Sequence, residues 1–269
     1  MEEEAFTVKR SRMIGSIIGD IVGSVFEHRN IKTTDFKLFN FGARYTDDTV
    51  LTIAIADAIL HHLPYDLALS EWGQRYPGRG YGNNFDTWLY SKDPRPYNSW
   101  GNGSAMRVSP IGFAFDDMER VLKEAKRSAE FSHNHPEGIK GAQAIAAAVF
   151  LARSGSSKSE IRDFITNKFD YDLNRTVEEI RPGYKFEISC QGSVPEAIIC
   201  FLDSNDFENC IRLAISIGGD SDTIACMAGG IAQAYYRSIG PEIVSTAKEN
   251  LAEEMIVVLD KFEGMYPIF

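Results

Sequence analysis

The sequence contains few cysteines and no long hydrophobic run. Only four of its 269 residues are cysteine, and none forms a C-x-x-C pair with another: Cys190, Cys200, Cys210 and Cys226. Neither a disulfide framework nor a zinc site is indicated, so we expect small buried side chains in a reducing compartment. No apolar stretch approaches the roughly 18 residues of a membrane span. We therefore expect a cytoplasmic protein that does not insert into a membrane.

Positive charge is also scarce. The chain has 28 Lys and Arg residues against 38 Asp and Glu residues, which gives a formal net charge of −10. This balance excludes an extended cationic face for nucleic acid or for an anionic membrane, although a nucleic-acid end could still enter a pocket. The composition favours chemistry on a small molecule. No feature of the sequence marks an oligomer interface, and we expect a monomer.

Strand-like alternation is rare, whereas apolar residues recur at three- and four-residue spacing along most of the chain. This spacing is typical of helices. The predicted helices span residues 12–28, 47–62, 64–75, 104–115, 117–131, 138–153, 157–169, 193–204, 206–217, 222–238 and 241–262. We predict an all-α fold, a compact bundle of roughly a dozen helices, with one domain over residues 11–269 after a disordered tail at residues 1–10.

Two predicted helices begin with the S-x-x-E pattern of a capping box. Ser157 is followed by Glu160, and Ser193 is followed by Glu196, so each serine is expected to precede a helix. By contrast, residues 76–103 are rich in glycine, proline and aromatic residues and form the longest predicted irregular region. A loop of this length in a compact domain commonly serves a function, so we expect it to form part of a site wall.

Carboxylates and threonines gather at two predicted helix starts, in the stretches YTDDT and GGDSDT. The residues concerned are Thr46, Asp47, Asp48, Asp220, Asp222 and Thr223. Either stretch alone is explained by helix capping and by the positive end of the helix dipole. Together they supply the oxygen ligands that Mg²⁺ and Mn²⁺ prefer. If they converge, a divalent cation must offset the repulsion between the carboxylates.

A third stretch, MIGSIIGDIVGSVFEHRN, has glycines at four-residue intervals. Gly15, Gly19 and Gly23 would form a stripe along a helix, which permits close approach of another backbone. Glu27 follows one turn later and could reach into a site from a loop. Asp20 lies within the helix, where two interpretations stay open: a partner of the site or a polar surface residue.

These stretches resemble a known family. The motifs GSIIGDIVGSVFE, YTDDT, WGNGSAMRVSPIG, SHNHPEGIKGAQA and GGDSDT occur in the order and rough spacing found in ADP-ribosylglycohydrolases. The resemblance extends from about Met13 to Arg237. It implies an orthogonal all-α bundle that holds two Mg²⁺ or Mn²⁺ ions and hydrolyses the glycosidic bond between ADP-ribose and an acceptor.

The resemblance also implies roles for individual residues. Carried across by position, the metal ligands are Thr46, Asp47, Asp48, Asp220, Asp222 and Thr223. Glu27 matches the family's catalytic glutamate, and Asp47 and Asp48 are placed with it in the catalytic set. A general base at Glu27 would act on water or on a ribose hydroxyl, and the sequence leaves both open.

The remainder of ADP-ribose is expected on three further segments. The stretch GNGSAMRV resembles the family's diphosphate-binding loop, with Asn102, Gly103, Ser104 and Ala105 as the predicted contacts. Arg107 is open between a phosphate contact and a structural ion-pair partner. His133 resembles a histidine that contacts ribose or phosphate, and His135 is expected to order a turn.

Aromatic side chains of the long loop are candidates for the adenine site. Tyr97 or Trp100 could stack on the adenine ring. The competing interpretation is that Trp100 anchors the loop to the core.

The acceptor and the activity have open alternatives. Arginine-specific family members have an acidic residue near the Gly-Asn of the diphosphate loop, where this sequence has Ser99 or Trp100, and Asp86 and Asp93 match that position poorly. Arginine, serine, an O-acetyl group and a nucleic-acid base stay open as acceptors. The rival functions are an ADP-ribose-binding module with weak catalysis and a metal-dependent hydrolase of phosphate esters or diphosphates.

Overall fold

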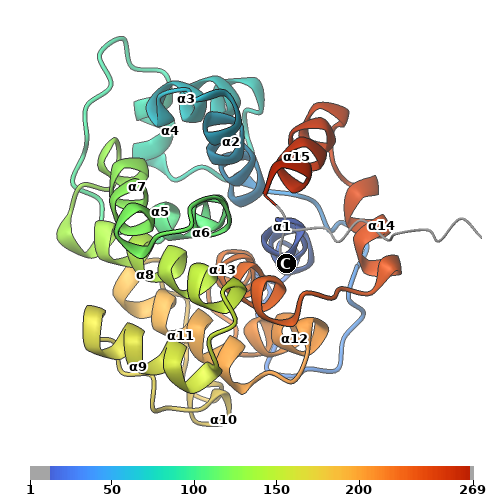
Figure 1. The fold of residues 1–269 in the computed structure, drawn as a ribbon. Helices are drawn as coiled ribbons and strands as arrows, with labels where there is room; N and C mark the ends of the chain where they lie inside the picture. Colours follow the sequence, from blue (N-terminus) through green and yellow to red (C-terminus); the bar gives the residue numbers. More distant parts are fainter. Residues whose placement is uncertain (1–12, 267–269) are drawn as a thin grey trace, which may run out of the picture.

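The regular secondary structure of the described residues is helical. It is a computed structural model that describes residues 13–266, so the tail predicted at residues 1–10 lies outside the described residues. In Figure 1, α1 and α13 lie side by side at the centre and the other helices surround them. Within residues 13–266, strand-like pairing is limited to one isolated bridge between Gly101 and Ser189. The predicted all-α fold is confirmed.

Fifteen helical segments are described, two of which, α5 and α10, are single turns of four residues. They are α1 (Ile14–Gly23), α2 (Asp47–His61), α3 (Tyr65–Arg75), α4 (Asn83–Leu89), α5 (Gly103–Met106), α6 (Ser109–Ala114), α7 (Met118–Glu130), α8 (Pro136–Arg153), α9 (Lys158–Phe169), α10 (Val177–Ile180), α11 (Cys190–Asp203), α12 (Phe207–Ser216), α13 (Ser221–Tyr236), α14 (Pro241–Glu249) and α15 (Glu253–Met265). None of the helices described is long and apolar enough to cross a membrane.

Several predicted helices differ from the observed ones. The first ends at Gly23 and gives way to turns, so Glu27 lies outside it. The segment predicted at residues 104–115 divides into α5 and α6, with Pro110 in the first turn of α6, because proline suits a helix start but removes an interior N–H donor. The segment at residues 241–262 divides into α14 and α15.

The long loop and one capping box were also predicted incorrectly. Residues 83–89 of the predicted irregular region form α4, which buries Phe85, Trp88 and Leu89 at helical spacing. The capping box at Ser193 is absent, because α11 already begins at Cys190 and is capped by the Ser189 side chain. The box at Ser157 is present as predicted.

The glycines of α1 form a close contact with α13. A Cβ added at Gly15 would lie 2.5 Å from the Gly229 carbonyl oxygen, and one at Gly19 would lie 2.0 Å from the Ala225 carbonyl oxygen. At Gly23 it would lie 2.5 Å from the Cα of Asp222. Only glycine leaves room for this approach. The predicted glycine stripe is therefore a backbone-to-backbone contact, and it ends at a candidate site residue.

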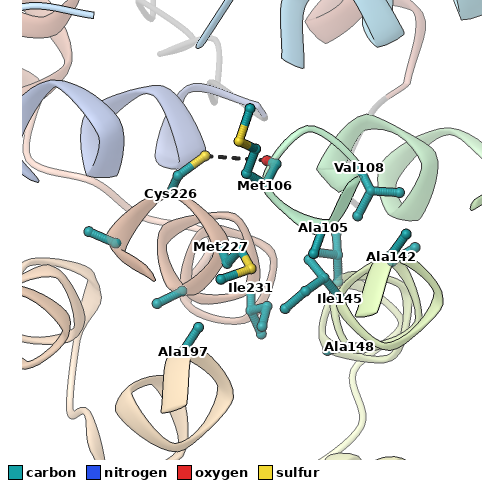
Figure 2. Close-up of a cluster of buried hydrophobic side chains, with 14 of the residues drawn as sticks. Ala105, Met106, Val108, Ala142, Ile145, Ala148, Ala197, Cys226, Met227 and Ile231 are labelled. Carbon is teal, nitrogen blue, oxygen red and sulfur yellow. Dashed lines mark hydrogen bonds between the residues drawn. The ribbon is translucent and has the colours of Figure 1, made fainter. Parts of the chain in front are cut away.

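The core surrounds α13. Figure 2 shows Met227 and Ile231 of α13 beside Ala105 of α5, Ile145 of α8 and Ala197 of α11, all of them buried. Since water is excluded from this contact, α13 is fixed by apolar burial on one side and by the glycines of α1 on the other. The N-terminal end of α13 is consequently held in place by the apolar core and by α1.

The cysteines behave as the sequence predicts. All four are buried and free. Cys226 donates from Sγ to the carbonyl oxygen of Met106 over 3.3 Å, which joins α13 to α5 (Figure 2). They act as small core side chains.

Gly19→Ala should lower the free energy of unfolding by about 2 to 3 kcal/mol, because the added methyl group meets the backbone of α13 and cannot be relieved by a side-chain rotation. Urea unfolding followed by circular dichroism measures this. Gly264→Ala is the matched control, since Gly264 also lies in a helix but has open space where the methyl group would go. An equal loss of stability in both variants would contradict the account of the α1–α13 contact.

Candidate active site

A cavity of about 720 Å³ opens where α1, α2 and α13 meet. Its lining includes Glu27, Asp47, Asp48, Asp220 and Asp222, which come from positions far apart in the sequence. Both predicted helix-start stretches therefore converge on one cavity.

Asp20 of α1 fixes the start of α2. Its side chain is fully buried and accepts hydrogen bonds from the backbone N–H of Thr46 at 2.9 Å and of Thr49 at 3.0 Å. The Thr46 hydroxyl donates to Asp20 over 2.7 Å, and its oxygen also caps α2 by accepting from the N–H of Asp48. Of the two interpretations left open for Asp20, the structure supports the partner of the site.

The carboxylates form two groups that share one residue. Oxygen atoms of Asp20, Asp48 and Asp222 lie within 4.8 Å of one another, and so do those of Glu27, Asp220 and Asp222. Asp47 lines the cavity but belongs to neither group. Asp48 Oδ1 is buried without a hydrogen-bond partner among the described residues. An oxygen-rich site with an unpartnered carboxylate atom fits a hard divalent cation.

Burial raises the pKa of every carboxyl in the two groups and of Asp47. Mutual repulsion adds to this effect: Asp20 raises the pKa of Asp47 and Asp48, and Asp220 raises that of Asp222. Ionising all of them together is costly unless positive charge is supplied. The site therefore favours either protonation or cation binding.

Polar side chains tie the separate elements of the site together. The Thr223 hydroxyl donates to Asp48 Oδ2 over 3.3 Å and joins the starts of α13 and α2. Asn102 Nδ2 donates to Asp220 Oδ2 over 2.7 Å and joins residues 101–105, the glycine loop, to α13. The carboxylates are held in place by neighbours that are not themselves charged.

The glycine loop lies beside these acids, but not all of its predicted contacts face the cavity. Asn102 and Gly103 line it. Ser104 and Ala105 are not among the lining residues; the Ser104 hydroxyl donates to the carbonyl oxygen of Gly138 over 2.7 Å. The loop is anchored by backbone pairing with the start of α11, where the Asn102 N–H donates to the carbonyl oxygen of Ile188.

Only some of the aromatic and histidine candidates line the cavity. Tyr97 and His133 line the cavity, whereas Trp100 does not. Trp100 is about half exposed and contacts the ring of His135 with centroids 5.7 Å apart. His135 caps α8 by accepting from the N–H of Glu137, as expected for a residue that orders the turn.

Several cavity residues were not anticipated. Arg44, Phe186 and Ile188 lie outside every predicted site segment. Arg79, Asn83 and Asn84 were not singled out, but they lie in residues 76–103, which were predicted to form part of a site wall. Arg79 reaches the site through its backbone, since its carbonyl oxygen accepts from the N–H of Asp47 over 2.9 Å. Such pairing is long-range and has no periodic signature in the sequence, although the glycines that flank Arg79 mark a tight turn.

One family profile matches nearly the whole chain. The sequence profile described as ADP-ribosylglycohydrolase matches residues 9–262. The chain belongs to the ADP-ribosylglycohydrolase family. The predicted class of enzyme, an ADP-ribosylglycohydrolase, is thereby confirmed.

Relatives from this family align over most of the chain. ADP-ribosylhydrolase ARH3 of Gallus gallus is 29% identical, with 91% of this chain and 88% of that protein covered. ADP-ribosylhydrolase ARH3 of Homo sapiens is 29% identical over 84% of this chain and 85% of its own. ADP-ribosylarginine hydrolase Tri1 of Pseudomonas putida (strain GB-1) is 25% identical, with 94% of this chain and 79% of that protein covered.

The fold agrees with this membership. A solved structure titled ADP-ribosylglycohydrolase-related protein complex superposes with a TM-score of 0.71 at 24% identity, covering 96% of this chain and 99% of that one. The family's helical architecture is thus shared along nearly the entire chain.

The stabilisation of the protein by Mg²⁺ should increase with pH. Because the folded-state pKa values of the site carboxyls are raised, the cation-free protein binds more protons folded than unfolded, and these groups oppose folding increasingly as pH rises above the ordinary aspartate value of 3.8. A cation must displace these protons, so its binding strengthens over the same range. Thermal unfolding in EDTA and in Mg²⁺ measures the difference. A shift independent of pH would contradict the account.

Proposed function

We propose that this protein hydrolyses the glycosidic bond between ADP-ribose and an acceptor, with divalent cations bound at the acidic cluster. The observation that carries the proposal is the convergence of Glu27, the starts of α2 and α13, and the glycine loop on one cavity. Family membership supplies the substrate, and the acids supply a site suited to bond cleavage at an anomeric carbon.

The residues present fit two Mg²⁺ or Mn²⁺ ions. The proposed ligands are those predicted from the sequence, namely Thr46, Asp47, Asp48, Asp220, Asp222 and Thr223. Asp222 belongs to both acidic groups, which suits a residue shared between two ions, and Asp20 holds Thr46 in position. Bound cations would neutralise the carboxylates and polarise ribose hydroxyls and water.

Glu27 is the proposed general base. It lies half-buried on the turn after α1, and burial together with the charge of Asp220 raises its pKa. A carboxylate whose pKa is closer to neutrality accepts and returns a proton more readily at physiological pH. Its target is water or a ribose hydroxyl at the anomeric centre. Asp47 and Asp48, in the same cavity, complete the proposed catalytic set.

The remainder of ADP-ribose extends away from the acids along the cavity. Asn102, Gly103 and His133 are the proposed contacts of the diphosphate, since all three line this part of the wall. Ser104 and Ala105 would support the loop from behind. Of the two aromatic candidates for adenine stacking, we favour Tyr97 over Trp100, because only Tyr97 lines the cavity.

Charge at the cavity wall bears on the acceptor. Besides the acidic set, the lining contains Arg44, Arg79 and Arg107, and the charge of Arg44 acts on Glu27. Asp86 and Asp93 do not line the cavity, so neither replaces the missing acid near the glycine loop. Once bound cations neutralise the acids, these arginines would repel a guanidinium acceptor. We therefore propose an uncharged or anionic acceptor, such as a hydroxyl or an ester.

Two further properties belong to the same proposal. All proposed site residues come from one chain, so a monomer suffices. Four free, buried thiols suit a reducing compartment, and a cytoplasmic location is accordingly proposed.

Glu27→Gln should retain ADP-ribose binding within about threefold while turnover falls by roughly 10² or more, because the amide has similar shape but cannot accept the proton. Calorimetry with ADP-ribose and product formation with an ADP-ribosylated substrate measure the two effects. A variant that turns over as fast as wild type would exclude Glu27 as the base.

A panel of substrates tests both the reaction and the acceptor. With Mg²⁺ or Mn²⁺, we expect free ADP-ribose from ADP-ribosylated serine or O-acetyl-ADP-ribose at kcat/KM values about tenfold or more above that for ADP-ribosylarginine. EDTA should abolish the release. AMP as the product would instead identify a diphosphate hydrolase, and binding without any product would identify a binding module.

Arg44→Glu should reduce the ratio of kcat/KM for the preferred substrates to kcat/KM for ADP-ribosylarginine, because the variant removes a positive charge from the cavity wall. Arg29→Glu is the control: it makes the same change in net charge at an exposed residue that does not line the cavity. Equal effects of the two variants would contradict the role assigned to the wall.

A further inference from the structure

Arg107 is a buried cation beneath the glycine loop. It is fully buried, and its Nη2 donates over 2.9 Å to the carbonyl oxygen of Ser128 and over 2.9 Å to Ser132 Oγ. Its Nε and Nη1 are buried and have no hydrogen-bond partner among the described residues. Arg107 forms no ion pair among the described residues, and it lines the cavity as well as contacting Ser132. It acts on Ser132.

Ser132 links Arg107 to His133. Its Oγ lies 2.8 Å from His133 Nδ1, and both residues are buried. A guanidinium has donors only, so Ser132 must accept from Arg107. The single hydroxyl hydrogen of Ser132 is then available for Nδ1. A donor that is itself hydrogen-bonded to a cation is a stronger donor, which reinforces this direction.

The charge of Arg107 favours the same arrangement. Burial, and next the charge of Arg107, lower the pKa of His133 well below its usual value, so the imidazole is neutral and carries one N–H. A lone pair on Nδ1 that faces the guanidinium through Ser132 is attracted to it. A proton on Nδ1 would be repelled.

The other ring nitrogen faces the glycine loop. A Cβ added at Gly103 would lie 3.1 Å from His133 Nε2, and one added at Gly101 would lie 3.7 Å from it. His133 also lines the cavity beside Asn102. A proton on Nε2 is therefore presented where the loop and the cavity meet.

We propose that Arg107 and Ser132 hold His133 in the neutral form that carries its proton on Nε2. The imidazole then donates a hydrogen bond from Nε2 to an anionic group of the ligand beside residues 101–103. The expected anion is the diphosphate of ADP-ribose, and in this respect the inference rests on the proposed function. Arg107 and Ser132 are positioning residues, since both act through His133.

Tyr97 is the competing partner of Ser132. The two side chains interact, and the rings of Tyr97 and His133 lie 5.8 Å apart. If the Tyr97 hydroxyl donates to Ser132, the Ser132 oxygen accepts twice and still gives its hydrogen to Nδ1. If Tyr97 accepts that hydrogen instead, His133 must carry its proton on Nδ1, which is the opposite form.

Long-range ¹⁵N–¹H NMR of the ligand-free protein, labelled at histidine, distinguishes the two forms directly. The signal of His133 is identified by its loss in His133→Asn. Wild type should show the Nε2–H pattern. Ser132→Ala should show a mixture of the two forms and bind ADP-ribose about tenfold more weakly, measured by calorimetry. Ser132→Thr keeps the hydroxyl and should preserve both the pattern and the affinity.

Ser128→Ala is the matched control. Ser128 lies in α7 and is as buried as Ser132, which follows the end of that helix. Ser128 meets Arg107 through its backbone carbonyl, and its hydroxyl donates to the carbonyl of Ala125. The Nδ1–H pattern in wild type, or equal effects of Ser132→Ala and Ser128→Ala, would overturn the inference. A wild type that shows Nε2–H but fails to bind ADP-ribose would contradict the proposed function and leave the tautomer assignment standing.

Discussion

The close approach of α1 to α13 is the constraint on which the site depends. Gly15, Gly19 and Gly23 allow the two backbones to touch, and the last of them meets Asp222 itself. This contact brings Asp20, which holds the start of α2, beside the start of α13. A methyl group at any of these glycines would separate the helices and with them the carboxylates. The packing of α1 against α13 therefore also determines where the carboxylates of the site lie.

The buried carboxylates destabilise the folded state of the cation-free protein. Burial raises the pKa of its carboxyls, so the folded chain must either keep protons there or bind positive charge. Threonine hydroxyls and Asn102 orient the acids without neutralising them. Opposite this acidic end, Arg107 supplies a buried positive charge behind the glycine loop. A ligand with an anionic middle and a polar sugar at one end matches this division of charge.

The sequence predicted most of the fold and the acidic half of the site. Helical periodicity and a serine or threonine at a helix start are local signals, which is why the helix start at Asp47 was predicted correctly. The start of α11 was missed because it is set by backbone pairing of Trp100 with Cys190, two segments distant in the sequence. The cavity role of Arg44 was missed for the same reason. Spacing alone also cannot show that Trp100 points away from the cavity while Tyr97 lines it.

Whether the buried carboxylates form a cation site is tested most directly by calorimetric titration of the cation-free protein with Mn²⁺ in buffers of different ionisation enthalpy. We expect saturable binding with release of protons. Asp222→Asn should lose most of this binding, whereas Asp206→Asn, at the N-cap of α12 where asparagine serves equally well, should not. Absence of binding by wild type, or equal binding by Asp222→Asn, would contradict the claim.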